Sequence, residues 1–476
     1  MIDLNERFSE KRNFFNRLIF VYVFFGVLFL YLIYKTFSLQ ISSYSDYELA
    51  SLENKTREFL VQPRRGIIYD RNGEIIVNNK PSYNMILDPE NVDDINELMF
   101  EIKKFINLSD AEIKNISNIF PNKKKLNREV VLKRNLTTEE IAKFEVRNYR
   151  FPDIQIAERY SRENLYPYLF SHSIGYVGNL DEEKLQEILS SQDLESNETI
   201  FTYSNGFLNG KTGIEYVYDE KLRGLFGKKI YEVDASGRLL QEKQMIPAVA
   251  GEDIFTSLDL SSQKVAYDEL NNRRGAVVAV DINDGSIVTY VSSPSFSVNK
   301  IANGLTQNEF NELINDDDKP FFDRAAQGRY SPASTIKPAI GLFGIDKDIL
   351  DWEYTIQDPG FFILPEDGRI YRGWKKGGHG EINLKDAIIE SSNTFFFSLA
   401  YQTEIEELRA HLSNFGFGKN VCDDCFMPDN GLLPSPRWKM NTHNFGWFKG
   451  DTVNVGVGQG YINACLLYTS DAADDV

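Results

Sequence analysis

The sequence predicts an α+β chain of several domains that begins with a transmembrane helix. Three observations lead to this prediction. The 476 residues exceed what one hydrophobic core usually serves. A long apolar run lies close to the N-terminus, at residues 18–34. Beyond it, short β-branched runs alternate with polar stretches of helical pattern, and 42% of the residues are hydrophobic, which allows sizeable cores.

The transmembrane helix is expected at residues 18–41. Leu18–Tyr34 contains no charged residue, and apolar positions further on extend the segment toward the roughly 20 residues that a span needs. Three basic residues precede the run, namely Lys11, Arg12 and Arg17. By the positive-inside rule, residues 1–17 form a cytoplasmic tail and the chain after the helix lies outside. Because no small-residue cleavage site follows, an uncleaved anchor is favoured over a removed signal peptide or a buried core helix.

Residues 42–250 are expected to form a domain of short strands and polar helices. Two of the helices are predicted at Ser109–Ile119 and Thr137–Val146. The formal charge of the whole chain is −18, and the acidic residues are dispersed. A nucleic-acid surface would require clustered Lys and Arg, so we expect no nucleic-acid partner.

Residues 251–464 are expected to form a second domain that opens with a helix near Ser261. Two apolar, β-branched runs follow, at residues 275–281 and 286–292. The Asp284-Gly285 pair between them is a typical hairpin turn. These runs are therefore predicted to be the first two strands of a central sheet.

The segment Ser334-Thr335-Ile336-Lys337 carries the strongest chemical indication, because Pro332 and Pro338 bracket the start of a helix there. Residues three apart share one helical face, so the Lys337 amine can reach the Ser334 hydroxyl and, when neutral, accept its proton. The spacing is common, however, and is expected by chance about twice in a chain of this length. Alone, it equally describes a capping serine and a surface lysine.

A second motif, Ser391-Ser392-Asn393, follows Ser334 by 391 − 334 = 57 residues. In this order the two motifs resemble the penicillin-recognising serine enzymes, where S-x-x-K supplies nucleophile and base and S-x-N lies opposite. Ser391 and Asn393 could instead cap the helix that begins near Thr394.

The resemblance extends from about Arg64 to Ala464, and it is closest to those class B penicillin-binding proteins that serve as transpeptidases of the rod-shape system. Five further stretches resemble the signatures of that family, namely residues 64–73, 210–215, 374–380, 450–452 and 458–460. The resemblance implies an elongated pedestal, or dimerisation, domain over residues 42–250. It also implies a transpeptidase domain with helices around an antiparallel sheet over residues 251–464.

The implied reaction is acyl transfer from a D-alanyl-D-alanine stem peptide through a serine acyl-enzyme that β-lactams also form. Ser334 would attack the penultimate carbonyl, and Lys337 would be the acylation base. Ser391 would relay a proton toward the leaving nitrogen, while Asn393 would hold the substrate backbone and the lysine. The Ser334 amide would be one oxyanion donor.

The family also has a Lys-Ser/Thr-Gly strand, which comes last in its sequences. Lys211-Thr212-Gly213 precedes Ser334, so we interpret it as part of the pedestal, where glycine permits tight turns. No such triplet follows Asn393. Residues 465–476 resemble a translated sequencing adapter, and we exclude them from fold reasoning. The last strands and helices are therefore expected to be missing, and this 476-residue chain is expected to be inactive.

Two other functions remain open. The chain could be a non-catalytic scaffold that activates a glycan polymerase, or a β-lactam sensor or β-lactamase. By resemblance, the expected partners are peptidoglycan stem peptides, β-lactams, a SEDS-family polymerase and rod-shape proteins. The expected location is the bacterial inner membrane, with the catalytic domain in the periplasm.

No cofactor or metal is expected. Asp358 and His379 lie where some relatives place zinc ligands, but Gly373 and Ser392 occupy the positions that match the others, and two ligands cannot close a tetrahedral site. The four histidines of the chain are scattered, and the chemistry needs none of them. Cys422 and Cys425 form a C-x-x-C pair, for which a disulfide and two free thiols remain equally open.

Overall fold

The computed structural model describes residues 4–38, 56–89, 92–125, 130–178, 208–233 and 239–466. The chain divides into two compact units. One unit combines residues 1–62 with residues 226–248, and the other combines residues 63–225 with residues 249–476.

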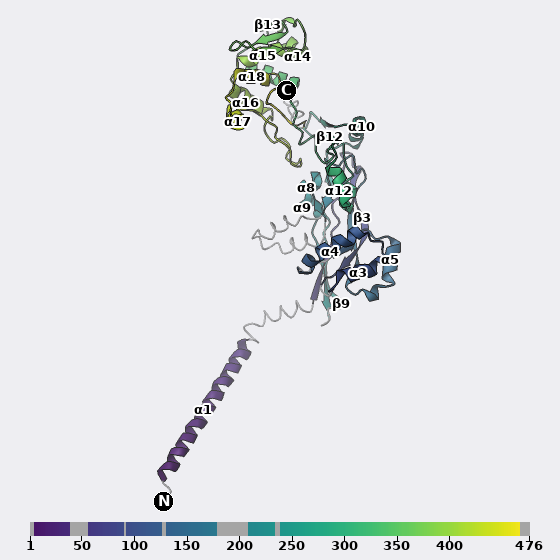
Figure 1. The fold of residues 1–476 in the computed structure, drawn as a ribbon, viewed down its shortest axis with the longest axis vertical. Coiled ribbons are helices and arrows are strands. Elements are labelled where there is room, and N and C mark those ends of the chain that lie inside the picture. The colour runs from purple at the N-terminus through teal and green to yellow at the C-terminus, as the bar shows by residue number, and fades with distance from the viewer. Residues whose placement is uncertain are drawn as a thin grey trace. The chain divides into compact units, whose positions relative to one another are not determined.

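The first unit contains helix α1 (Leu4–Phe37) and a small antiparallel sheet. Figure 1 shows α1 as one continuous helix. Its segment Leu18–Phe37 has a mean hydropathy of 2.2, so by length and composition it is a candidate membrane span. The helix is confirmed where the sequence predicts it, except that residues 39–41 lie outside the described part. The sheet has the order β1-β8-β9 and consists of β1 (Thr56–Val61), β8 (Gly227–Val233) and β9 (Leu239–Ile246).

A five-stranded sheet organises the N-terminal part of the second unit. Its order is β10-β2-β3-β4, with β5 paired to β3. The strands are β2 (Ile68–Tyr69), β3 (Ile75–Leu87), β4 (Val130–Lys133), β5 (Ile154–Asn164) and β10 (Ile254–Phe255). The long antiparallel pair β3–β5 runs in register from Val77 opposite Asn164 to Leu87 opposite Ile154.

Three amphipathic helices lie beside this sheet (Figure 1). They are α3 (Ile95–Lys103), α4 (Asp110–Lys125) and α5 (Thr138–Glu145). Met99, Ile102 and Phe144 of these helices are almost fully buried and belong to the same apolar cluster as Met85 of β3. Both helices that the sequence predicts here, α4 and α5, are confirmed. Thr137 caps α5 with a capping box, which explains why that helix begins where it does.

A buried ion-pair cluster joins two of the family-like stretches. Glu215 is 1% exposed and accepts hydrogen bonds from Arg65 Nε at 2.7 Å and Arg162 Nε at 2.6 Å. Burial by itself would raise the pKa of Glu215, but the two guanidinium groups hold that pKa below its ordinary value. Four short elements lie close to Glu215 in the sequence or pair with those that do, namely β6 (Val177–Gly178), β7 (Asn209–Gly210), α8 (Gly213–Val217) and α9 (Asp219–Arg223). A single 3₁₀ turn, η2 (Asn148–Arg150), precedes β5.

The C-terminal part of the second unit is rich in helices. It begins with α10 (Leu260–Leu270), the hairpin β11 (Gly275–Val280) and β12 (Ile287–Ser293), α11 (Val298–Asn303) and α12 (Gln307–Ile314). The segment that contains Ser334 is η4 (Ala333–Ile336), a 3₁₀ turn, followed by α13 (Lys337–Asp346). Two small hairpins come next, β13 (Thr355–Asp358) with β16 (Gly380–Asn383) and β14 (Phe361–Ile363) with β15 (Ile370–Arg372). The remaining helices are α14 (Leu384–Ile389), α15 (Asn393–Tyr401), α16 (Ile405–Asn414), α17 (Pro436–His443) and α18 (Lys449–Val455).

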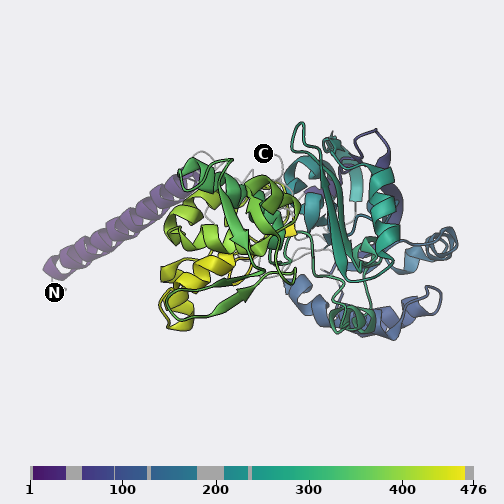
Figure 2. The same cartoon turned by 90° about the horizontal axis from the view of Figure 1, so that it is seen from above.

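The core of this part lies among α13, α15, α16 and α18. The helix α15 packs against both α13 and α18, and α13 also packs against α16. Phe343, Phe396, Leu408 and Val453 are each 0% exposed there. Figure 2 shows these helices, green to yellow, as one group. Burial of such large apolar side chains gives the segments around Ser334 and Ser391 a rigid support.

The predicted helix near Ser261 and the predicted hairpin are confirmed as α10 and β11–β12. The helix expected at Ser334 begins with a 3₁₀ turn, so the regular α-helix starts only at Lys337. The domain boundaries predicted at residues 42, 250 and 464 stay predictions. Of the segment interpreted as an adapter, Cys465 is fully buried, while residues 467–476 lie outside the described part.

Candidate active site

Ser334 lies exposed at the 3₁₀ turn before α13, and the turn is held from a distant segment. Ala333 adopts a left-handed conformation with φ 50°, and its N–H donates to the carbonyl of Gly458 at 2.9 Å. A Cβ atom on Gly458 would lie 2.1 Å from the Ala333 carbonyl oxygen. Only glycine therefore permits this approach, which gives the family-like stretch at residues 458–460 a structural role beside the serine.

Lys337 is the first residue of α13, and its side chain is 1% exposed. Its Nζ donates three hydrogen bonds, to the Ser391 carbonyl at 2.8 Å, to Ser391 Oγ at 3.0 Å and to Asn393 Oδ1 at 2.7 Å. Burial disfavours the charged amine and lowers the pKa of Lys337 to about 8. A buried lysine with this pKa is suited to accept a proton near neutral pH.

Ser391 lies between the lysine and the candidate nucleophile. Its Oγ accepts a hydrogen bond from Lys337 Nζ and donates one to Ser334 Oγ at 3.0 Å. Sequence reasoning expected the Lys337 amine to reach Ser334 directly, but among the described residues no hydrogen bond joins these two side chains. The 3₁₀ turn explains the difference, since Ser334 and Lys337 do not belong to one regular α-helix. The four predicted residues thus form one connected group.

Ser392 is the residue that caps α15. Its Oγ accepts from the Phe395 N–H at 3.2 Å, and its side chain is 0% exposed. Sequence reasoning left open that Ser391 or Asn393 caps this helix. Because Ser392 takes that role, the side chains on either side of it can both contact Lys337.

Asp358, at the end of β13, is buried beside Ser392. Its Oδ2 accepts hydrogen bonds from His379 Nδ1 at 2.6 Å and Ser392 Oγ at 2.8 Å, and its Oδ1 accepts from the Gly360 N–H at 2.7 Å. Burial alone would raise the pKa of Asp358, but these hydrogen bonds hold that pKa below its ordinary value. Sequence reasoning considered Asp358 and His379 only as metal ligands and did not predict this network.

The donor set around Asp358 does not fit a tetrahedral zinc ion. His379 and Ser392 direct their donors at one carboxylate oxygen, and the glycine at position 373 has no side-chain ligand. Within the described residues, the one group with metal-ligand spacing is Cys422, Asp424 and Cys425.

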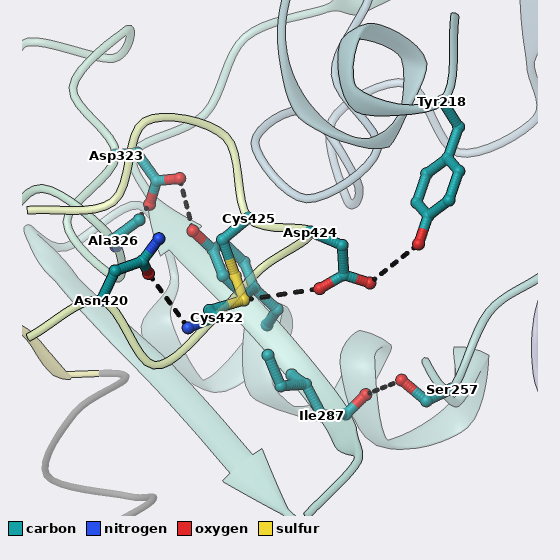
Figure 3. Close-up of a disulfide and its surroundings, with 10 residues drawn as sticks. Tyr218, Ser257, Ile287, Asp323, Ala326, Asn420, Cys422, Asp424 and Cys425 are labelled. Carbon is teal, nitrogen blue, oxygen red and sulfur yellow. Dashed lines mark hydrogen bonds between the residues drawn. A yellow bond between two sulfur atoms is a disulfide. The ribbon is translucent and has the colours of Figure 1, made fainter. Parts of the chain in front are cut away.

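Cys422 and Cys425 are joined as a disulfide in the structure, so their sulfur atoms are not available as thiolate ligands (Figure 3). Asp424 Oδ2 accepts a hydrogen bond from the Tyr218 hydroxyl at 3.4 Å. The disulfide lines a cavity of about 460 Å³ that Tyr290 and Asp323 also line. None of the four candidate catalytic residues lines this cavity.

The Lys211-Thr212-Gly213 triplet lies at the start of α8, where Gly213 adopts φ 60°. A Cβ atom on Gly213 would lie 2.5 Å from the carbonyl carbon of Ile174. The glycine thus serves a tight turn in the N-terminal part of the unit, as the sequence interpretation expected.

Two family models match the chain. The penicillin-binding protein dimerisation domain matches residues 60–256, and the penicillin-binding protein transpeptidase domain matches residues 275–470. Together with the fold, these matches define a two-domain penicillin-binding protein, which confirms the predicted fold class.

Curated relatives narrow the family. The peptidoglycan D,D-transpeptidase MrdA of Acinetobacter baumannii is 36% identical over 459 residues, which cover 96% of this chain and 67% of the relative. MrdA of Escherichia coli K12 is 33% identical, with coverage of 94% of this chain and 70% of the relative. Penicillin-binding protein 2 (PBP2) of Helicobacter pylori, solved in complex with MreC, is similar with a TM-score of 0.74 at 28% identity, covering 87% of this chain and 76% of that one. The chain belongs to the PBP2 (MrdA) family of peptidoglycan D,D-transpeptidases, and its function is transpeptidation in cell-wall synthesis.

Proposed function

We propose that the transpeptidation proceeds through a serine acyl-enzyme in which Ser334 is the nucleophile. The observation that supports this proposal is the continuous hydrogen-bonded chain from Ser334 Oγ through Ser391 Oγ to Lys337 Nζ. An activated serine needs a base within hydrogen-bond reach, or a group that relays the proton to one.

The proton moves along this chain during acylation. With Lys337 neutral, its lone pair accepts the Ser391 proton, and Ser391 Oγ accepts the Ser334 proton as Ser334 Oγ bonds to the penultimate D-alanine carbonyl carbon. When the tetrahedral intermediate collapses, the same relay returns a proton to the nitrogen of the departing D-alanine. With a pKa of about 8, roughly a tenth of Lys337 is neutral at about pH 7.

Asn393 and the backbone complete the proposed site. The Asn393 amide oxygen holds the Lys337 amine, and its amide nitrogen would donate to the substrate backbone. The Ser334 N–H serves as one oxyanion donor. The second donor belongs to the strand with the Lys-Ser/Thr-Gly triplet, which the printed sequence does not contain after Asn393.

The partners and location are also proposals. PBP2 of Helicobacter pylori was solved in complex with MreC, and a rod-shape partner of this kind is proposed for this chain. A SEDS-family glycan polymerase is proposed from the sequence resemblance alone. The substrates are stem peptides, and β-lactams would acylate the same serine. The proposed topology places the N-terminus in the cytoplasm and the catalytic part in the periplasm, because basic residues precede the apolar helix.

The test uses the protein expressed from the resequenced genomic locus, with any continuation of the reading frame included; we call it the locus protein. A fluorescent penicillin should label it with one molecule per chain, and Ser334→Ala should abolish the label. Ser331→Ala is the matched control, because Ser331 is exposed and lies three residues before Ser334. Labelling that survives Ser334→Ala would refute the assignment. A locus protein that takes no label at all would instead support the scaffold alternative.

A further inference from the structure

We infer that Asp358 is a positioning residue of the active site, which acts through Ser392 to hold Ser391 and Asn393 against Lys337. The inference rests on the proposed roles of those residues and adds a buried hydrogen-bond network behind them. Asp358 itself lies behind the site, because its side chain is 1% exposed and, among the described residues, it makes a hydrogen bond with neither Ser334 nor Lys337.

The carboxylate of Asp358 is fixed from three directions. The His379 ring, the Ser392 hydroxyl and the Gly360 N–H all donate to it, at 2.6, 2.8 and 2.7 Å. A buried carboxylate with three donors stays ionised and accepts only. Since Asp358 ends β13 and His379 directly precedes β16, the acceptor is anchored to a paired hairpin.

The ionised carboxylate determines how the Ser392 hydroxyl is oriented. A hydroxyl has one proton, and Ser392 gives it to Asp358, so that its lone pairs face the Phe395 N–H at 3.2 Å. The same side chain thus caps α15 and ties the first turn of that helix to the hairpin. A serine without this acceptor could rotate between several rotamers.

The residues on both sides of Ser392 are the ones that hold the lysine. Ser391 has a left-handed backbone with φ 52°, which is unfavourable for a serine and persists only where surrounding contacts enforce it. Its carbonyl and hydroxyl both accept from Lys337. Asn393, the first residue of α15, supplies the third acceptor. Fixing Ser392 therefore fixes all three acceptors of the amine.

A second contact holds the same segment from the same side. Trp374 Nε1 donates to the carbonyl of Glu390 at 3.1 Å, and the Trp374 ring meets the His379 ring edge-to-face at 5.7 Å. His379 Nε2 is buried without a hydrogen-bond partner among the described residues, and it lies 4.0 Å from Glu390 Oε2. Trp374 thus contacts Glu390, and Asp358 contacts Ser392. These are the two residues on either side of Ser391.

The test compares acylation rates of the locus protein with a chromogenic cephalosporin, separating the binding constant from the rate of the acylation step. Asp358→Asn should lower the acylation rate at least tenfold and leave the binding constant within about twofold, because the serine and its pocket remain. Asp367→Asn is the matched control, since Asp367 also accepts a backbone N–H in a nearby hairpin turn but is exposed. That variant should react as the unmodified protein does.

A double-mutant cycle separates positioning from general destabilisation. Ser392→Ala should lower the acylation rate by a similar factor, and the double variant should react no more slowly than the slower single variant, because both changes break one interaction. Ser392→Thr keeps the hydroxyl and should recover most of the rate. Thermal melts identify variants that fail to fold; if Asp358→Asn does not fold, the Ser392→Ala and Ser392→Thr pair carries the test.

The inference is overturned if Asp358→Asn and Ser392→Ala acylate at the unmodified rate, or if their effects multiply in the double variant. It is also overturned if the purified locus protein holds one zinc ion per chain that Asp358→Asn loses. Failure of the proposed function would give a different result. The Ser334→Ala variant would then still be labelled by the fluorescent penicillin, whichever residue stands at position 358.

Discussion

The amide oxygen of Asn393 lies 2.7 Å from Lys337 Nζ, so changes at this position should move the pKa of the lysine in opposite directions. Asn393→Asp places a negative charge at about this distance. By Coulomb's law the attraction is worth about 1.5 kcal/mol in water-like surroundings and about 6 kcal/mol at an effective dielectric constant near 20. The pKa of Lys337 should therefore rise by at least about one unit. Asn393→Ala removes an acceptor from the ammonium group and should lower that pKa.

The assay is the rate of acylation by a penicillin, measured in the locus protein from about pH 6 to about pH 10. The unmodified protein should gain about tenfold in rate per pH unit and level off near pH 8, because the neutral amine is the reactive form. With Asn393→Asp, the midpoint should move to about pH 9 or above. The rate at pH 7 should then fall at least about tenfold, since the neutral fraction drops from roughly a tenth to roughly a hundredth.

The control is Asn441→Asp, which adds the same charge at an exposed position of α17 and should leave the midpoint where it is. Asn393 also meets the substrate in the proposed mechanism, so the plateau rate can fall in both variants. Only the pH midpoint of the acylation rate therefore tests whether Lys337 is the base. If it does not move, or if Asn393→Asp and Asn393→Ala shift it in the same direction, the assignment of Lys337 as the base is refuted.

Three further predictions concern other parts of the chain. Lys337→Arg should lower acylation by about a hundredfold or more at every pH tested, because guanidinium does not lose its proton; a rate that recovers at high pH would contradict this. Glu215→Gln should lower the free energy of unfolding by about 3 to 5 kcal/mol in urea titrations, since among the described residues it leaves the buried guanidinium group of Arg162 without an ion-pair partner, whereas Arg65 keeps Asp219, and a loss below about 1 kcal/mol would refute that reasoning. Reduction of the disulfide between Cys422 and Cys425 should lower stability by no more than about 2 kcal/mol, because the bond closes a loop of only about four residues. A much larger loss would show that the bridge constrains more than its own loop.

Two local motifs, taken together with the resemblance to a known family, led to Ser334, Lys337, Ser391 and Asn393, which the structure brings together and whose roles stay predictions. Ser334 and Lys337 share one turn, and Ser391 and Asn393 flank the start of a helix, so both pairs could be read from local patterns. The amphipathic helices α4 and α5 and the hairpin β11–β12 were also predicted from local sequence patterns. Hydrophobic periodicity and turn residues determine such elements within a short window, which is why the structure confirms them.

The contacts that arrange the site could not be predicted in this way. Asp358 meets Ser392 across 34 residues, and Ala333 meets Gly458 across a longer separation, so both contacts depend on tertiary packing. The route from Ser334 to Lys337 through Ser391 depends on a 3₁₀ turn, and no residue pattern distinguishes that turn from the first turn of an α-helix. Nothing in the sequence indicated that Ser392, rather than Ser391 or Asn393, caps α15.

The environment of Lys337 shows why its burial matters for the chemistry. The ammonium form has three N–H groups, and three acceptors from Ser391 and Asn393 receive them. Burial favours the neutral form and lowers the pKa of Lys337 to about 8. At about pH 7 the neutral form then costs about 1.4 kcal/mol, against nearly 5 kcal/mol for a lysine with its ordinary pKa. In the proposed mechanism, burial thus lowers the free energy needed to form the neutral amine by roughly 3 kcal/mol, and the acceptors hold the amine beside Ser391.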